Sequence, residues 1–364
     1  MSKKALRNLT FIAILLALTV ILLGAWTRLE DAGLGCPDWP GCYGHFTVPQ
    51  DAEYIAKAEI EYGKKFEAEK AWPEMIHRHF AKGIGLVIVI MFIGAWLGRK
   101  KDPTVPVVLP TTLLPLVILQ GLLGMWTVTL KVHPFIVMLH LLGGFTTLSL
   151  LFLYYLQLRP KIVSLSQVVA KKFKALAFAG LILVIGQIAL GGWTASNYAA
   201  TVCAELPFCN SGWTQNVDFK GGFDLWQKGF EFDEFQTLEE EKQQADLNKA
   251  QGKPFKDYEG GILSHQAKVA IHVTHRFGAY LVFVVIGLLA VWLMREKDSI
   301  LLRRFGRALG VILLAQMMLG VSNVIFGLPL YVAVAHNGGG AILLLAMIAT
   351  NYLVNWQFKG KGQV

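Results

Sequence analysis

LGAWT at residues 23–27 returns almost unchanged as LGGWT at residues 190–194, and the spacing that follows it is also repeated. In each copy a cysteine lies ten residues after the tryptophan, and a second cysteine lies six residues after the first. Further along, a glutamine stands 20 residues before a histidine in both copies, with a glycine four residues after the glutamine. A register kept over this length indicates two copies of one structural unit.

Long apolar blocks decide the environment of the repeated unit. The chain of 364 residues is 54% hydrophobic and 16% charged, which is typical of an integral membrane protein. Runs of about 20 apolar residues, enough to cross a bilayer, start near Leu9, Phe80, Val105, Phe135, Phe173, Val269, Phe305 and Tyr331. We therefore expect an all-α integral membrane protein with eight transmembrane helices. Residues 1–160 and 161–364 would form two pseudo-symmetric four-helix bundles.

Charge decides the orientation of these helices. Basic residues, 18 Lys or Arg against three acids, gather at the N-terminus and at 99–104, 159–174, 295–307 and 358–364. The long connections, 29–76 and 195–268, are net acidic. By the positive-inside rule both termini are cytoplasmic. The net charge of +9 is then a topology signal, and nucleic-acid binding is not expected. A short basic head without a transit-like extension favours a bacterial inner membrane.

Four histidines recur at corresponding positions near the outward ends of the helices. His77 and His140 are 63 residues apart in the first copy, and His275 and His336 are 61 apart in the second. A histidine inside a membrane helix is costly and usually functional. Two facing imidazoles at one depth of a bundle can hold an iron porphyrin from both sides. The repeat therefore favours a bis-histidine heme site in each half.

Two other interpretations compete for these histidines. Any one of them alone would be explained as a histidine hydrogen-bonded within the bundle. A zinc site is suggested by His272, one turn before His275, but a third and fourth ligand at closed spacing are missing.

The neighbours of the histidines fit a porphyrin. Glycines three and four residues after two of them share the ligand's helix face and leave a flat surface for a macrocycle; they are Gly143, Gly144, Gly339 and Gly340. Arg78 and Arg276 directly follow the other two histidines at the headgroup level. An arginine there suits bidentate contact with heme propionates.

EMIHR at 74–78 contains the main difference between the copies, because Glu74 aligns with His272. A simple electron carrier with two hemes needs no acid in only one half. A carboxylate beside one porphyrin pocket suggests a proton acceptor or a group that stabilises positive charge at the edge of the macrocycle. The alternative is a helix N-terminal acid after Pro73 that interacts with the helix dipole.

Taken together, these motifs resemble the heme A synthase family, and the resemblance covers all eight predicted helices. It rests on TRLEDAGLGCPDWPGC at 27–42, EMIHR at 74–78, HVTHR at 272–276, the two later histidine helices and the second cysteine pair. The resemblance implies an enzyme that oxidises a methyl group of heme O, through a hydroxymethyl intermediate, to the formyl group of heme A for cytochrome oxidase biogenesis.

The same resemblance assigns the residues. His77 and His140 would flank the iron of the substrate heme O, and His275 and His336 would ligate heme b, on the periplasmic side of the membrane. Glu74 would be the essential acid. A heme O synthase and an electron-transfer protein are implied as partners beside the lipid bilayer. Whether the repeats exchange electrons within one chain or across a homo-oligomer stays open, as does the source of the inserted oxygen.

All four cysteines fall in the outward connections, in a compartment that permits disulfides. Five residues separate the members of each pair, and CPDWPGC contains Pro and Gly that can bring its ends together. We expect disulfides Cys36–Cys42 and Cys203–Cys209. A structural staple is favoured for the second pair. For the first pair a staple and the redox contribution that the resemblance implies both stay open.

The second outward connection is about 31 residues longer than the first, between its second cysteine and the following histidine. Its segment EEEKQQADLNKAQGK at 239–253 predicts a surface helix or a mobile flap.

Two other functions remain as alternatives to the enzyme. A diheme cytochrome that carries electrons between quinone and an outer partner would explain the histidines and leave Glu74 incidental. A transporter would explain the tandem repeat, but no predicted span is visibly broken near its middle, and the notable polar residues cluster near one surface.

Overall fold

The computed structural model describes residues 1–159, 167–215, 217–227 and 257–356. Eight of the helices described are long and apolar enough to cross a membrane. They are α1 (Lys3–Leu29), α3 (Ala68–Lys101), α4 (Val108–Thr129), α5 (Pro134–Leu158), α6 (Gln167–Ser196), α9 (His265–Arg295), α10 (Ile300–Ile325) and α11 (Leu330–Asn351). The expected all-α, multi-pass membrane fold is confirmed.

The remaining elements are short and lie at the ends of the long helices. They are α2 (Ala52–Tyr62), the 3-10 turn Trp213–Gln215, α7 (Phe219–Gly222) and the π-helical turn Tyr352–Trp356. The segment 239–253 and the boundary expected at 160–161 lie outside the described residues.

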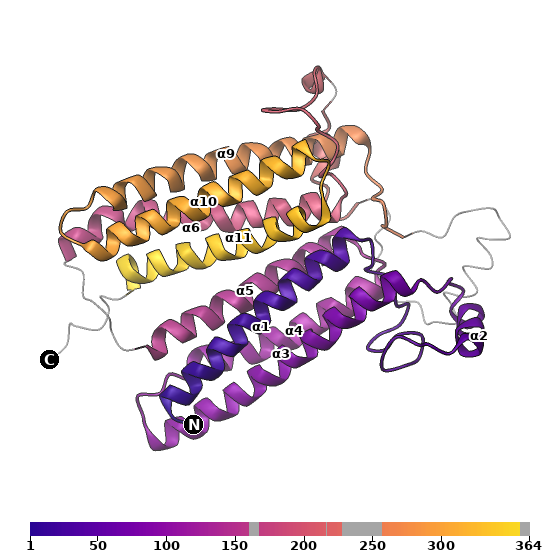
Figure 1. The fold of residues 1–364 in the computed structure, drawn as a ribbon, viewed down its shortest axis with the longest axis horizontal. Coiled ribbons are helices and arrows are strands. Elements are labelled where there is room, and N and C mark those ends of the chain that lie inside the picture. The colour runs from indigo at the N-terminus through magenta and orange to yellow at the C-terminus, as the bar shows by residue number, and fades with distance from the viewer. Residues whose placement is uncertain (160–166, 216, 228–256, 357–364) are drawn as a thin grey trace.

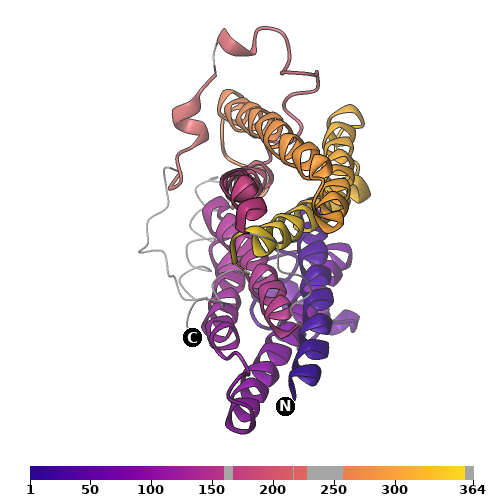
Figure 2. The same cartoon turned by 90° about the vertical axis from the view of Figure 1, so that its left-hand side faces the viewer.

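The long helices form two groups that lie side by side (Figure 1). One group is α1, α3, α4 and α5, and the other is α6, α9, α10 and α11; they meet through α1 and α5 on one side and α6 and α11 on the other. Figure 2 shows the same arrangement from one end, with α9, α10 and α11 of the later group, in orange and yellow, above the earlier group. The start of α1 lies at the same end of the molecule as the end of α11 (Figure 1).

Large apolar side chains cover the outside of both groups. Leu97, Leu288, Val311 and Met318 are among those left exposed on the helices. Because hydrocarbon does not penalise such a surface and water does, this is the exterior expected of helices that cross a bilayer.

At the end opposite the start of α1, the first long connection folds back onto the start of α3. Cys36, Cys42 and Tyr43 form a buried cluster with residues of α2 and with Met75 on α3. Burial raises the pKa of Tyr43 to about 12, with a further contribution from Glu59. This loop end of the molecule, which carries both cysteine loops, is also where the histidine-bearing helices α3 and α9 begin.

Arg28, in the last turn of α1, joins the two groups at the loop end. Its guanidinium donates to the carbonyl oxygens of Ala195, at 2.7 Å, and Ser196, at 3.4 Å, at the end of α6. It also lies 3.9 Å from the ring centroid of Tyr198 and forms an ion pair with Asp31 at 3.1 Å. Arg28, which directly follows LGAWT in the sequence, therefore connects the first half to the second.

Candidate functional site

The structure brings the rings of the first histidine pair close together. His77 on α3 and His140 on α5 have ring centroids 6.3 Å apart, and their planes cross at 85°. A metal–imidazole bond of about 2 Å on each side of a shared iron separates two ring centroids by roughly 6 Å. The pair therefore fits two axial ligands of one heme.

Each of the four histidine rings lies against a glycine on a neighbouring helix. A methyl group added at that glycine would lie 2.9 Å from the Cε1 atom of His77, 3.4 Å from that of His140, 3.2 Å from that of His275 and 3.1 Å from that of His336. The glycines are Gly24, Gly124, Gly191 and Gly320, respectively. The glycine of LGAWT and LGGWT is thus the seat of a histidine ring, a role that the sequence alone does not reveal.

Several ring nitrogens have no protein partner. The Nδ1 atoms of His77, His140 and His336 are buried and accept or donate no hydrogen bond in the described structure. Buried polar atoms normally have a partner, so buried imidazole nitrogens without one fit ligands of a bound group. In the described ranges, no three His, Cys, Asp or Glu residues gather to hold a metal ion, so nothing supports the zinc alternative.

The glycines that follow His140 and His336 have two different environments. At Gly143 and Gly339 an added methyl group would overlap the side-chain amide of Gln120 and of Gln316. At Gly144 it would meet nothing within 4 Å. A glutamine therefore fills the space beside Gly143 and Gly339. The space beside Gly144 is open, as a macrocycle would require.

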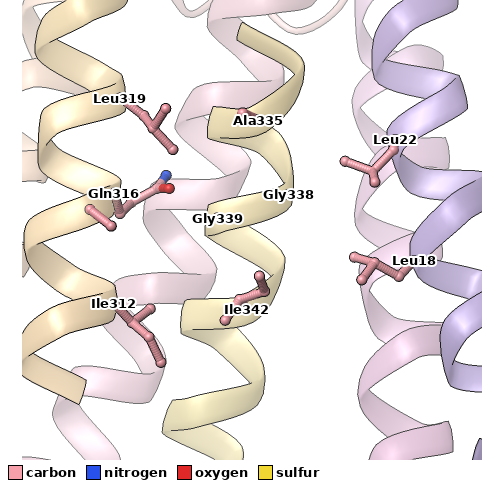
Figure 3. Close-up of a pocket in the computed structure, with 10 residues that line it drawn as sticks. Leu18, Leu22, Ile312, Gln316, Leu319, Ala335, Gly338, Gly339 and Ile342 are labelled. Atoms are coloured by element: carbon pink, nitrogen blue, oxygen red, sulfur yellow. The ribbon is translucent and has the colours of Figure 1, made fainter. Parts of the chain in front are cut away.

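An apolar pocket of about 350 Å³ lies where the two halves meet. Leu18 and Leu22 of α1 form one wall, and residues of α10 and α11, including Gln316 and Gly339, form the rest (Figure 3). Gln316 is its only polar side chain. The pocket thus reaches the helix of His336 from the side of the first half.

Glu74 is buried and tied to the first cysteine loop. One carboxylate oxygen accepts a hydrogen bond from the backbone N–H of Cys36 at 2.8 Å, and the other pairs with the guanidinium of Arg78. In the second half the corresponding His272 accepts from the Nε of Arg276 at 3.3 Å. Because an arginine Nε–H needs an acceptor, His272 is a neutral imidazole there. A buried carboxylate one turn before the histidine is therefore specific to the first half.

Arg78 and Arg276 hold the cysteine loops by the same three carbonyl oxygens in each half. Arg78 donates to the carbonyl oxygens of Cys36, Asp38 and Gly41, and Arg276 to those of Cys203, Glu205 and Phe208. Counted from the first cysteine, the positions are identical. In this structure both guanidiniums are occupied by loop backbone, so their contact with heme propionates stays a prediction.

Both expected disulfides are present. Cys36 is bonded to Cys42 and Cys203 to Cys209, with Cα–Cα distances of 4.7 Å in each. Cys36 and Cys42 are completely buried beneath the first loop. One turn beyond each arginine, Lys82 and Tyr280 bond the carbonyl oxygen of a loop proline, which is a further correspondence that sequence reasoning missed because the two side chains differ.

Comparison with known proteins agrees with this geometry. Residues 7–348 match the family described as cytochrome oxidase assembly protein. The heme A synthase of Shewanella oneidensis is 42% identical over 347 residues, which cover 94% of each chain. The heme A synthase of Mesorhizobium japonicum is 24% identical, covering 94% of this chain and 88% of its own, and that of a Caulobacter strain (K31) is 27% identical, covering 92% and 91%. The chain belongs to the heme A synthase family of cytochrome oxidase assembly proteins.

Proposed function

We propose that this protein is a heme A synthase, which oxidises a methyl group of heme O through a hydroxymethyl intermediate to the formyl group of heme A. The observation that carries the proposal is the presence of two histidine sites in one chain with a buried carboxylate, Glu74, at only one of them. The full-length match to heme A synthases favours this enzyme over a diheme cytochrome.

The two halves bind different hemes. His77 and His140 hold the substrate heme O in the half formed by residues 1–160. His275 and His336 hold heme b in residues 161–364, the half with the enlarged outer connection at about 195–268. Heme b, when bound, supplies one-electron transfer. The chain itself provides the imidazoles, their glycine seats and an apolar surround that excludes water.

Glu74 lies one helical turn before His77 and is held in a fixed direction. Two hydrogen bonds, from the Cys36 amide and from Arg78, leave its carboxylate little freedom to rotate. Such a group can accept a proton, or stabilise positive charge, at the edge of a heme bound next to His77.

We assign Cys36 and Cys42 a positioning role in the same reaction. Their disulfide closes the loop whose first amide donates to Glu74, and both cysteines are completely buried. Opening the disulfide would release that amide and with it the direction of the carboxylate. A redox contribution of the pair would require access that the closed loop does not give.

The termini lie in the cytoplasm and the histidine sites towards the periplasm of a bacterial inner membrane. The basic connections at 99–104 and 295–307 lie at the end of the molecule where α1 starts, and the cysteine loops lie at the other (Figure 1). Heme O, delivered by a heme O synthase, would enter from the bilayer, and an electron-transfer partner would meet the protein at one of its two surfaces.

Extraction and mass analysis of the hemes that copurify with the protein, made in a host that supplies heme O, test the proposal. We expect heme A or its hydroxymethyl intermediate with wild type and with the control Glu53→Ala, an exposed acid of α2. Glu74→Ala and Glu74→Gln should yield neither. Heme b alone in every sample, with heme O left unchanged, would instead support the diheme carrier.

A further inference from the structure

Three of the four histidine sites share a pair of residues that the fourth lacks. A glutamine precedes the seat glycine by four residues, and a glycine follows the histidine by three. The pairs are Gln120 with Gly143, Gln187 with Gly278, and Gln316 with Gly339. At His77 the same two positions are occupied by Val20 and Phe80.

The members of each pair are matched in size. A methyl group at any of the three glycines would overlap the amide of its glutamine, so the glutamine can lie there only because the glycine has no side chain. Figure 3 shows this for Gln316, whose amide extends from α10 towards α11 at Gly339. At the corresponding position of the first half, α3 carries Phe80, which is 41% exposed.

In the second half these glutamines hold the histidines. The Nε2 atom of Gln187 lies 3.0 Å from Nδ1 of His275 and donates to the carbonyl oxygen of His275 at 2.9 Å. Gln316 donates to the carbonyl oxygen of His336 at 3.1 Å. Each bond fastens the histidine's helix to its neighbour at the level of the ring. The side chain of Val20 offers no such bond, and Nδ1 of His77 is buried without a partner.

Partners of a metal-bound histidine affect how firmly the metal is held, and losing one typically weakens metal binding by about 10- to 100-fold. Both ligands of the first half are therefore less restrained than those of the second half. His77 has no glutamine beside it, and at His140 the Nε2 atom of Gln120 is buried without a hydrogen-bond partner. A heme in the first half would be released first.

We propose that Val20 and Phe80 make the first half the exchangeable heme site, whereas Gln187 and Gln316 retain the heme of the second half. The inference rests on the proposed function, which needs one heme that enters and leaves and one that stays. Val20 and Phe80 are positioning residues, because they act through the His77 ring.

Transfer of heme to excess apomyoglobin measures release directly. The full-length protein is loaded with heme b in both halves and kept without oxidant, so that no turnover is required. We expect two phases of equal amplitude in the wild type. Val20→Gln/Phe80→Gly should slow the fast phase about tenfold, and Gln187→Val should accelerate the slow phase about tenfold. Gln266→Val, at an exposed glutamine of α9, should change neither phase.

A single phase from wild type carrying two hemes would overturn the inference. So would an unchanged fast phase in a Val20→Gln/Phe80→Gly protein that keeps its helicity and both hemes. If that double variant does not fold, Gln187→Val decides, and an unchanged slow phase refutes the proposal. Failure of the proposed function is distinguishable, because it would appear as absence of heme A from wild type without altering these release rates.

Discussion

Alanine at the glycine seats should displace the histidine rings, most of all at Gly24. Its new methyl group would lie 2.9 Å from Cε1 of His77. Carbon atoms pack best at about 3.5–4.0 Å, so the ring must move by roughly 0.6 Å or more. Metal–ligand distances tolerate only about 0.2 Å. Gly24→Ala should therefore break or strain the bond between His77 and a heme iron.

The size of the effect follows from the cost of overpacking, which is about 1–3 kcal/mol. At about 1.4 kcal/mol per factor of ten, heme binding in the first half should weaken roughly 5- to 150-fold. The corresponding distances grow from Gly320 (3.1 Å) through Gly191 (3.2 Å) to Gly124 (3.4 Å), so the losses should decrease in that order. Helix propensity alone predicts the opposite sign. Replacing a helical glycine by alanine should stabilise the helix by about 0.5–1 kcal/mol.

The assay is the heme-to-protein ratio and the low-spin heme spectrum of each purified variant. Gly121→Ala and Gly186→Ala are matched controls on α4 and α6, where an added methyl group meets nothing within 4 Å. Both should keep the wild-type spectrum. Full low-spin heme in Gly24→Ala, or an equal loss in the controls, would refute the assignment of these glycines as histidine seats.

Three further outcomes are expected. His275→Ala should lose the resident heme b, and unchanged heme b content would contradict the assignment of the halves. Arg276→Gln should free the second cysteine loop, so the thiols of that loop should be alkylated faster under mild reduction. Arg303 contacts backbone at the opposite end, so Arg303→Gln should behave as wild type. Equal alkylation rates in both variants would argue against the role of Arg276 in holding the loop. Cys36→Ser/Cys42→Ser should lower heme A yield while heme b is retained, and a wild-type yield would exclude the positioning role.

The transmembrane helices could be predicted from sequence because a bilayer demands long apolar runs whatever the tertiary contacts. The run near Phe135 corresponds to α5, which begins at Pro134, and the run near Tyr331 to α11, which begins at Leu330. The largest difference is in α3, which begins at Ala68 rather than near Phe80. The polar first turns of α3 pack against the folded first loop. Because these turns are not part of an apolar run, the sequence pattern did not predict them.

The site was only partly predictable. The four histidines and both disulfides followed from a repeated register, which needs no knowledge of packing. The seat of His77 lies 53 residues away at Gly24, and only the packing of α1 on α3 reveals the contact. Arg78 was assigned to propionates because its position suggests the headgroup level. That contact stays a prediction; the structure adds that Arg78 donates to loop carbonyl oxygens, and backbone groups leave no trace in a sequence pattern.

The link that Arg28 makes between the ends of α1 and α6 also bears on electron tunnelling. Tunnelling rates depend steeply on distance, and the hydrogen bonds from Arg28 to the end of α6 hold the two halves together at this point. Two hemes bound in the two halves would therefore keep one fixed separation. If the two hemes of one chain exchange electrons with each other, the rate should be unchanged when the protein is diluted to one copy per lipid nanodisc.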